Sequence, residues 1–179
     1  MTEPRDAHAE RLEELFRRHH SAVAAYARRR APSDAADDVV ASTFLVAWRR
    51  LDQVPADALP WLLAVARNVI ATQHRGSQRR GALRVRLEGS ESAAVPSPEE
   101  ADDRVVAALG RLSERDREAI TLIAWDGLQP AEAAAVLGQS AATFRVRLHR
   151  AKRRLRREMD RGEAADRRPN THLSPRRSP

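Results

Sequence analysis

The sequence has no cysteine and few aromatic residues, and both shortages restrict what the chain can be. Without thiols it forms no disulfides and offers a metal no thiolate ligands. Aromatic residues make up only 4% of the chain, and its apolar residues are mostly alanine, leucine and valine, which favours helical packing over a β-sheet. We therefore predict an all-α protein.

Long apolar runs are also missing. No stretch approaches the roughly 20 apolar residues of a membrane-spanning helix. The amino terminus, MTEPRDAHAERLEELF, lacks the basic start and apolar core of a signal peptide. These absences lead us to expect a cytoplasmic protein with no membrane segment of its own.

Charge is abundant and unevenly distributed. Residues from Arg145 to the carboxyl end carry a net charge of +9 and those from Arg67 to Arg86 carry +6, whereas the remainder carries −8. Basic blocks of this kind lower the energy of approach to a polyanion and release its counterions. Nucleic acid is therefore the predicted partner.

The segment from Gln129 to Leu155 has the pattern of two helices joined by a tight turn. Pro130 suits the first turn of a helix, where its missing N–H is no loss. Gly138 can adopt the left-handed conformation that often ends a helix, and Ser140 can cap the helix that follows. This order of signals is typical of a helix-turn-helix.

The second of these helices is predicted to turn Phe144 and Leu148 inward, because they lie one helical turn apart. Ala133 and Ala134 are small enough for the first helix to cross it closely. The side chains left outside are those of Arg145, Arg147, His149 and Arg150. We interpret the segment as a DNA-reading unit; the alternative is an ordinary helical hairpin with a solvated basic face.

Three further helices are predicted in the first half of the chain, at residues 10–30, 35–51 and from Pro60 to about Arg80. Pro32 separates the first two, and Ser33 or Asp34 is the expected cap of the second. Apolar residues recur at helical spacing in each. They are Leu12, Leu15, Phe16, Val23 and Tyr26, then Val40, Phe44, Ala47, Trp48 and Leu51, and finally Leu62, Val65, Ala66 and Val69.

These elements predict two small helical domains, residues 1–82 and 104–159, joined by a flexible acidic linker at 83–103. The linker is rich in Gly, Ser, Pro and acid, and its charge could mimic nucleic acid. Within the second domain, Ser113 is the expected cap of a helix that precedes Gly127. A disordered basic tail is predicted at 160–179.

Candidate catalytic or metal groups are few. Asp37 and Asp38 are neighbours on a predicted helix, so their carboxylates diverge, and the negative charge suits a helix start. His19 and His20 are likewise adjacent and cannot form a helical metal pair. We predict neither an enzyme nor a bound cofactor.

Three strings of sequence, in this order, carry a resemblance to a known family. They are DDVVASTFLVAWRRL, WLLAVARNVI and LSERDREAITLIAWDGLQPAEAAAVLGQSAATFRVRLHRAKRRL. Together the chain from Leu15 to Leu155 resembles the extracytoplasmic-function (ECF) sigma factors of bacterial RNA polymerase. The resemblance implies core polymerase, through its clamp and flap regions, and promoter DNA as partners. It also implies an anti-sigma factor as regulator and melting of the minus-ten element.

The resemblance also implies three sets of site residues. Core polymerase would be bound by Asp37, Asp38, Ser42, Thr43, Trp48 and Arg49. The minus-ten element would be bound by Asp52, Gln53, Trp61, Arg67, Asn68, Thr72, Arg75, Arg79 and Arg80, with the loop from Asp52 to Leu59 taking up a flipped base. The minus-thirty-five element would be bound by Ser140, Thr143, Arg145, Arg147, Arg150, Lys152, Arg153 and Arg154.

The sequence departs from the family pattern at several of these places. Ala41 and Ser42 stand where the family commonly has Gln and Glu, and Thr72 stands where it has Asp. Phe144 replaces a smaller β-branched residue but stays apolar. Trp61 fits either the core or an aromatic platform for an unstacked base. A stand-alone helix-turn-helix regulator that does not bind polymerase is the alternative function.

Overall fold

The computed structural model describes residues 4–82 and 103–166. Regular structure in these two ranges is entirely helical, which confirms the predicted fold class. The elements are α1 (Pro4–Arg28), α2 (Ala36–Arg49), the short 3-10 turn η1 (Leu51–Gln53), α3 (Ala58–Ala82), α4 (Asp103–Gly110), α5 (Glu114–Ala124), α6 (Pro130–Val136) and α7 (Ala141–Asp166). None of the described helices is long and apolar enough to cross a membrane.

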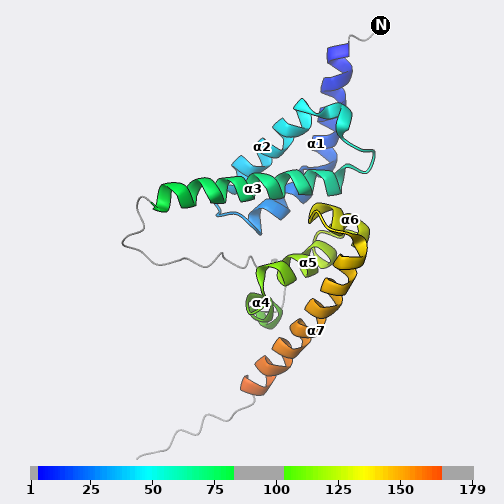
Figure 1. Cartoon of the computed structure of the whole chain (residues 1–179). Helices are drawn as coiled ribbons and strands as arrows, with labels where there is room; N and C mark the ends of the chain where they lie inside the picture. The colour runs from blue at the N-terminus through cyan, green and yellow to red at the C-terminus, as the bar shows by residue number, and fades with distance from the viewer. Residues whose placement is uncertain (1–3, 83–102, 167–179) are drawn as a thin grey trace, which may run out of the picture.

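Helices α1, α2 and α3 pack against one another and form the amino-terminal module (Figure 1). Their buried faces follow the helical spacing of the apolar residues. Val23, Val39 and Leu62 are fully buried at the centre of this core. Phe16 was predicted to be buried but is 46% exposed, because it lies over Phe44 at the edge of the α1–α2 contact.

Two helix starts differ from the sequence prediction. Helix α2 has Ala35 at its N-cap with no side-chain capping bond, so neither Ser33 nor Asp34 caps it. Helix α3 begins at Ala58 rather than at Pro60. Proline is tolerated there because the first turn of a helix has free N–H groups and needs no donor from that position.

Helices α4 to α7 form the carboxyl-terminal module, and its predicted caps are confirmed. Ser113 Oγ accepts a hydrogen bond from the backbone N–H of Asp116 at 3.3 Å. Ser140 Oγ accepts one from the N–H of Thr143 at 3.1 Å. Gly138 has φ of +63°, the left-handed conformation expected at the end of α6. The turn of the helix-turn-helix is thus set by local chemistry.

The two helices of the helix-turn-helix pack closely, as predicted. Ala133 and Ala134 of α6 are buried, as are Phe144 and Leu148 of α7. The start of α6 carries Pro130 at its first turn, and the Glu132 side chain accepts from the backbone N–H of Gln129 at 2.6 Å. In α5 the buried apolar residues are Ala119, Ile120 and Leu122, whereas Ala124 is exposed.

Helix α7 extends to Asp166, beyond Met159, so the prediction of a disordered tail from residue 160 is wrong for its first seven residues. Oppositely charged residues continue the helix, and Arg161 pairs with Glu158 one turn earlier. Asp103 starts α4 and so does not belong to the predicted linker. The rest of that linker and the tail from residue 167 lie outside the described residues.

Gly138→Ala is expected to destabilise the protein by about 1–2 kcal/mol, because an L-residue resists the left-handed conformation that this position requires. No atom lies within 4 Å of the added Cβ, so strain and not collision causes the loss. Urea unfolding followed by circular dichroism measures it. Gly162→Ala, within helix α7, is the matched control and should stabilise slightly. Equal unfolding midpoints for Gly138→Ala and the wild type would contradict the argument.

Candidate nucleic-acid and polymerase interfaces

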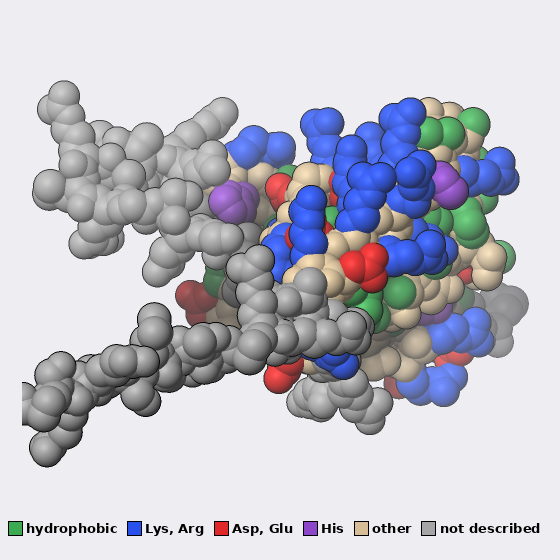
Figure 2. Space-filling model, turned by 90° about the horizontal axis from the view of Figure 1, so that it is seen from below, with side chains coloured by type: hydrophobic (Ala, Val, Ile, Leu, Met, Phe, Trp, Pro, Cys, Tyr) green, Lys and Arg blue, Asp and Glu red, His purple; other side chains and the backbone are tan. Residues whose placement is uncertain are grey.

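Helix α7 presents a continuous cationic face to solvent. Because Phe144 and Leu148 anchor it inward, the opposite side of the helix is left free. Lys and Arg side chains gather on one face of the molecule in Figure 2. The exposed side chains of α7 include Arg145, His149, Arg150, Lys152 and Arg153, and Arg147 is partly buried. The predicted basic face of the helix-turn-helix therefore forms as expected.

A shallow hollow of about 520 Å³ runs along one side of this helix. Thr143, Val146, Arg147 and Arg150 line it, three, four or seven residues apart except for the neighbours Val146 and Arg147, so they lie on one side of the helix. Val146 is 52% exposed and was not among the predicted site residues. Its signal in the sequence is an apolar residue two positions away from both Phe144 and Leu148. An apolar side chain among arginines can contact a thymine methyl group.

Arg154 differs from the other predicted DNA-binding cations because it already has an anionic partner. Its guanidinium donates to the carboxylate of Asp116, whose side chain is almost completely buried. A buried carboxylate needs such a partner, since an isolated charge is costly to remove from water. Arg154 is therefore a link between α7 and α5 rather than a free phosphate contact.

A second polar face lies on α3. Asn68, Thr72 and Arg75 are exposed on one side of the helix, at the positions predicted for the minus-ten element. Thr72 Oγ1 donates to the Asn68 carbonyl at 2.8 Å, and Arg75 donates to Thr72 Oγ1 at 3.1 Å. This chain of bonds orients the Arg75 guanidinium along the helix. The side chains of Arg79 and Arg80 lie outside the described part of the structure.

Two other residues of the predicted minus-ten set are not free. Arg67 donates from Nε to the Glu118 carboxylate at 2.8 Å. This bond raises the pKa of the Arg67 guanidinium. Trp61 is partly buried and packs against the core, which favours the core interpretation of this residue over a platform for a base.

The loop before α3 is anchored at one point and exposed at the rest. Arg11 of α1 donates to the carbonyl of Val54 at 2.9 Å, and Val54 itself is buried. Asp52 and Gln53 remain exposed, with Asp52 also lying 3.6 Å from His8. The loop thus presents polar side chains from a fixed backbone.

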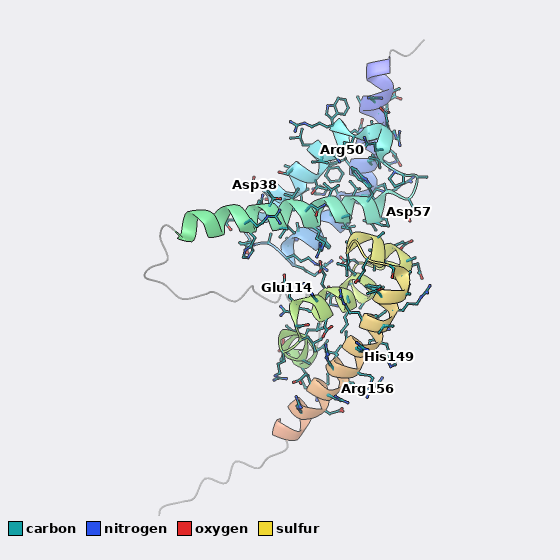
Figure 3. All side chains as sticks on the ribbon, in the orientation of Figure 1. Asp38, Arg50, Asp57, Glu114, His149 and Arg156 are labelled. Atoms are coloured by element: carbon teal, nitrogen blue, oxygen red, sulfur yellow. The ribbon has the colours of Figure 1, made fainter. Side chains whose placement is uncertain are left out.

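One face of α2 is exposed and carries large apolar side chains. Leu45 is 49% exposed and Trp48 is 42% exposed, although Trp48 was predicted to belong to an apolar stripe of the core. Leu45 was not among the predicted site residues. The same face contains Asp37, Asp38, Ser42 and Arg49, which are exposed or partly exposed. Figure 3 labels Asp38 on this helix. Exposed apolar side chains with a charged border are typical of a protein-binding surface.

Thr43 was predicted to contact polymerase, and the structure contradicts this. Its side chain is fully buried, and its hydroxyl donates to the Val39 carbonyl at 2.7 Å. A threonine within a helix can satisfy its hydroxyl in this way when apolar neighbours surround it. It therefore belongs to the core of the amino-terminal module.

The structure was also inspected for clusters of side chains that could bind a metal ion. Within residues 4–82 and 103–166, no group of three or more His, Cys, Asp or Glu side chains is placed to hold a metal ion. The candidate functional surfaces are those of α2, α3 and α7.

Comparison with known protein families identifies the two modules. The family Sigma-70 region 2 matches residues 15–80, and the family Sigma-70, region 4 matches residues 102–155. The two modules thus have the order and content of a sigma-70-type sigma factor.

Individual relatives show which group of sigma factors the chain resembles. The chain is 34% identical over 160 residues to RNA polymerase sigma factor CnrH of Cupriavidus metallidurans, covering 79% of this chain and 83% of that protein. It is 32% identical over 163 residues to ECF RNA polymerase sigma factor SigL of Mycobacterium tuberculosis, covering 84% and 89%. The chain belongs to the ECF family of RNA polymerase sigma factors.

Solved structures show the same architecture. CnrH in complex with the cytosolic domain of CnrY has a TM-score of 0.60 and 33% identity, over 84% of this chain and 88% of that one. The sigma factor RpoE of Bartonella quintana, in complex with the anti-sigma factor NepR, has a TM-score of 0.66 and 27% identity, over 83% and 96%.

Proposed function

We propose that this protein binds the RNA polymerase core, directs it to specific promoters and helps to melt the minus-ten element. The single observation that carries the proposal is the presence in one chain of two separate polar DNA faces, on α3 and α7, together with an exposed apolar face on α2. A stand-alone regulator needs the α7 face but has no use for the other two. The protein contributes no catalysis of its own and acts in the cytoplasm, where polymerase and promoter lie.

Helix α7 binds the minus-thirty-five element in this proposal. Arg145 and Arg147 flank Val146 on the exposed side, and Arg150 lies one turn further along. Bidentate arginine contacts to guanine and an apolar contact to thymine together distinguish base pairs in the major groove. Thr143, Ser140, Lys152 and Arg153 contact the phosphate backbone and fix the orientation of the helix.

The amino-terminal module binds the other two partners. Asn68, Thr72 and Arg75 of α3, with the loop residues Asp52 and Gln53, contact the minus-ten element and its melted strand. The α2 face docks on the polymerase clamp through Leu45 and Trp48, whose exposure is otherwise a cost in water. An anti-sigma factor that covers this α2 face would keep the protein from polymerase, in line with the complexes solved for RpoE and CnrH.

The proposal is tested by reconstitution. Purified core polymerase mixed with this protein should start transcripts at defined promoters, and mapping their starts would reveal both promoter elements. Core polymerase without the protein is the control. A protein that binds duplex DNA by itself but neither binds core polymerase nor supports initiation would be a stand-alone regulator.

Arg145→Ala and Arg147→Ala should each weaken holoenzyme binding to the promoter by about 1–3 kcal/mol, because each removes one base contact. Folding should be unaffected, since both side chains lie outside the Phe144 and Leu148 face. Promoter occupancy is measured by footprinting across a series of base substitutions. Arg28→Ala, which removes an exposed cation from α1, is the matched control. Unchanged occupancy and sequence preference in both α7 variants would refute the assignment.

Leu45→Ala and Trp48→Ala should weaken binding to core polymerase, with Trp48→Ala costing about 2 kcal/mol, or roughly 30-fold in Kd. Binding is measured by titration of labelled protein with core enzyme. The free energy of unfolding should change little, because both side chains are nearly half exposed. Val146→Ala removes an equally exposed apolar side chain from α7 and should leave this Kd unchanged. Normal affinity in both α2 variants would exclude the face as the docking site.

A further inference from the structure

The loop between α2 and α3, residues 50–57, is anchored in the core at two points. Leu51 and Val54 are buried, whereas the other residues of the loop are exposed. Figure 3 labels Arg50 and Asp57 at the two ends of the loop. Side chains on a loop are held less precisely than those on a helix unless neighbouring groups support them. The polar side chains of this loop therefore need support from outside it.

Such support comes from the first turns of α1. Arg11 Nη2 donates to the carbonyl of Val54 at 2.9 Å, across 43 residues of the chain. Val54 has the extended conformation that is expected of a residue before proline, here Pro55. A hydrogen bond from a charged donor is stronger than one between neutral groups. The bond is made to a backbone carbonyl, so it fixes the main chain of the loop rather than one of its side chains.

A second residue of α1 contacts the same loop. His8 lies one helical turn before Arg11, so the two side chains share one side of the helix. His8 Nε2 lies 3.6 Å from Asp52 Oδ1, and the His8 ring meets the Trp48 ring edge-on with centroids 6.4 Å apart. In Figure 1 the first turns of α1 lie beside the end of α2, where the loop begins. We call His8 and Arg11 the loop brace.

The loop brace lies outside the segment that matches the family. Sigma-70 region 2 matches residues 15–80, and both residues of the brace precede that range. Leu12 and Leu15 of the same helix pack against the core and hold this part of α1 in place. The contact between α1 and the loop is therefore not part of the pattern by which the family is identified.

We propose that the loop brace positions Asp52 and Gln53 to read the minus-ten element, and so contributes to promoter specificity without itself contacting a base. This inference rests on the proposed function, in which these two side chains contact the melted strand. A flipped base is recognised by hydrogen bonds to its edge, and such contacts require groups held to within about 0.5 Å. Without the Arg11 bond the loop keeps its apolar anchors, but its backbone samples more positions. Correct and incorrect bases are then bound with more similar free energies.

Amide hydrogen exchange in the free full-length protein tests the brace directly. The N–H groups of Gln53 and Val54 donate within the loop, to the carbonyls of Arg50 and Leu51. Arg11→Met keeps an apolar stem but has no donor, so exchange at these two amides should become roughly tenfold faster. The matched control is R17M, which removes a cation of the same helix that pairs within that helix, and it should leave exchange unchanged.

Base discrimination by the holoenzyme is the second readout. It is the ratio of initiation at a promoter identified by start mapping to initiation at the same promoter with one base changed. In Arg11→Met this ratio should fall roughly threefold or more at the minus-ten element, because the contacts that separate right from wrong bases weaken. It should stay unchanged at the minus-thirty-five element, which α7 reads. Affinity for core polymerase should also be unchanged, and Arg17→Met should match the wild type throughout.

Unchanged exchange in Arg11→Met would overturn the brace, and faster exchange with normal minus-ten discrimination would overturn its role in reading the promoter. Equal loss of discrimination at both elements would also overturn it, because a general loss of stability affects both modules. A wild type that initiates, with an Arg11→Met variant that discriminates normally, disproves this inference alone. A wild type that never initiates disproves the proposed function, and the exchange rates still decide whether Arg11 holds the loop.

Discussion

The buried carboxylate of Asp126 between Arg29 and Arg30 is the interaction on which the arrangement of the two modules depends. One apolar cluster contains buried residues of both modules, and buried ion pairs add to the contact between them. Withdrawn ion pairs contribute little net stability, because desolvation offsets their attraction. They do impose geometry, since each charge is costly without its partner. The ion pairs therefore fix the orientation of the modules.

Two modules with separate DNA faces suit a protein that is proposed to bind DNA at two distant elements. Helices carry the three proposed surfaces. One side of each of α2, α3 and α7 is buried in the core, which leaves the opposite side exposed. Arg67 of α3 is bound by Glu118 of α5, so one ion pair joins a helix of each module.

Much of the fold was predictable because its signals are local. The caps at Ser113 and Ser140, the left-handed Gly138 and the small residues of α6 follow from backbone chemistry within one turn. The errors occurred where local signals are weak or contacts are distant. The end of α7 has no strong stop signal, and the burial of Thr43 depends on α1 and α3 closing over α2.

The sequence by itself determined the helices, the helix-turn-helix and the family, because periodicity, capping and motif order are properties of neighbouring residues. Only the tertiary structure decided which cations are free. Arg145 and Arg150 are exposed, whereas Arg67 and Arg154 are bound by Glu118 and Asp116. Their partners lie 51 and 38 residues away in the chain, so no pattern along the sequence distinguishes a DNA-binding arginine from one that joins two helices.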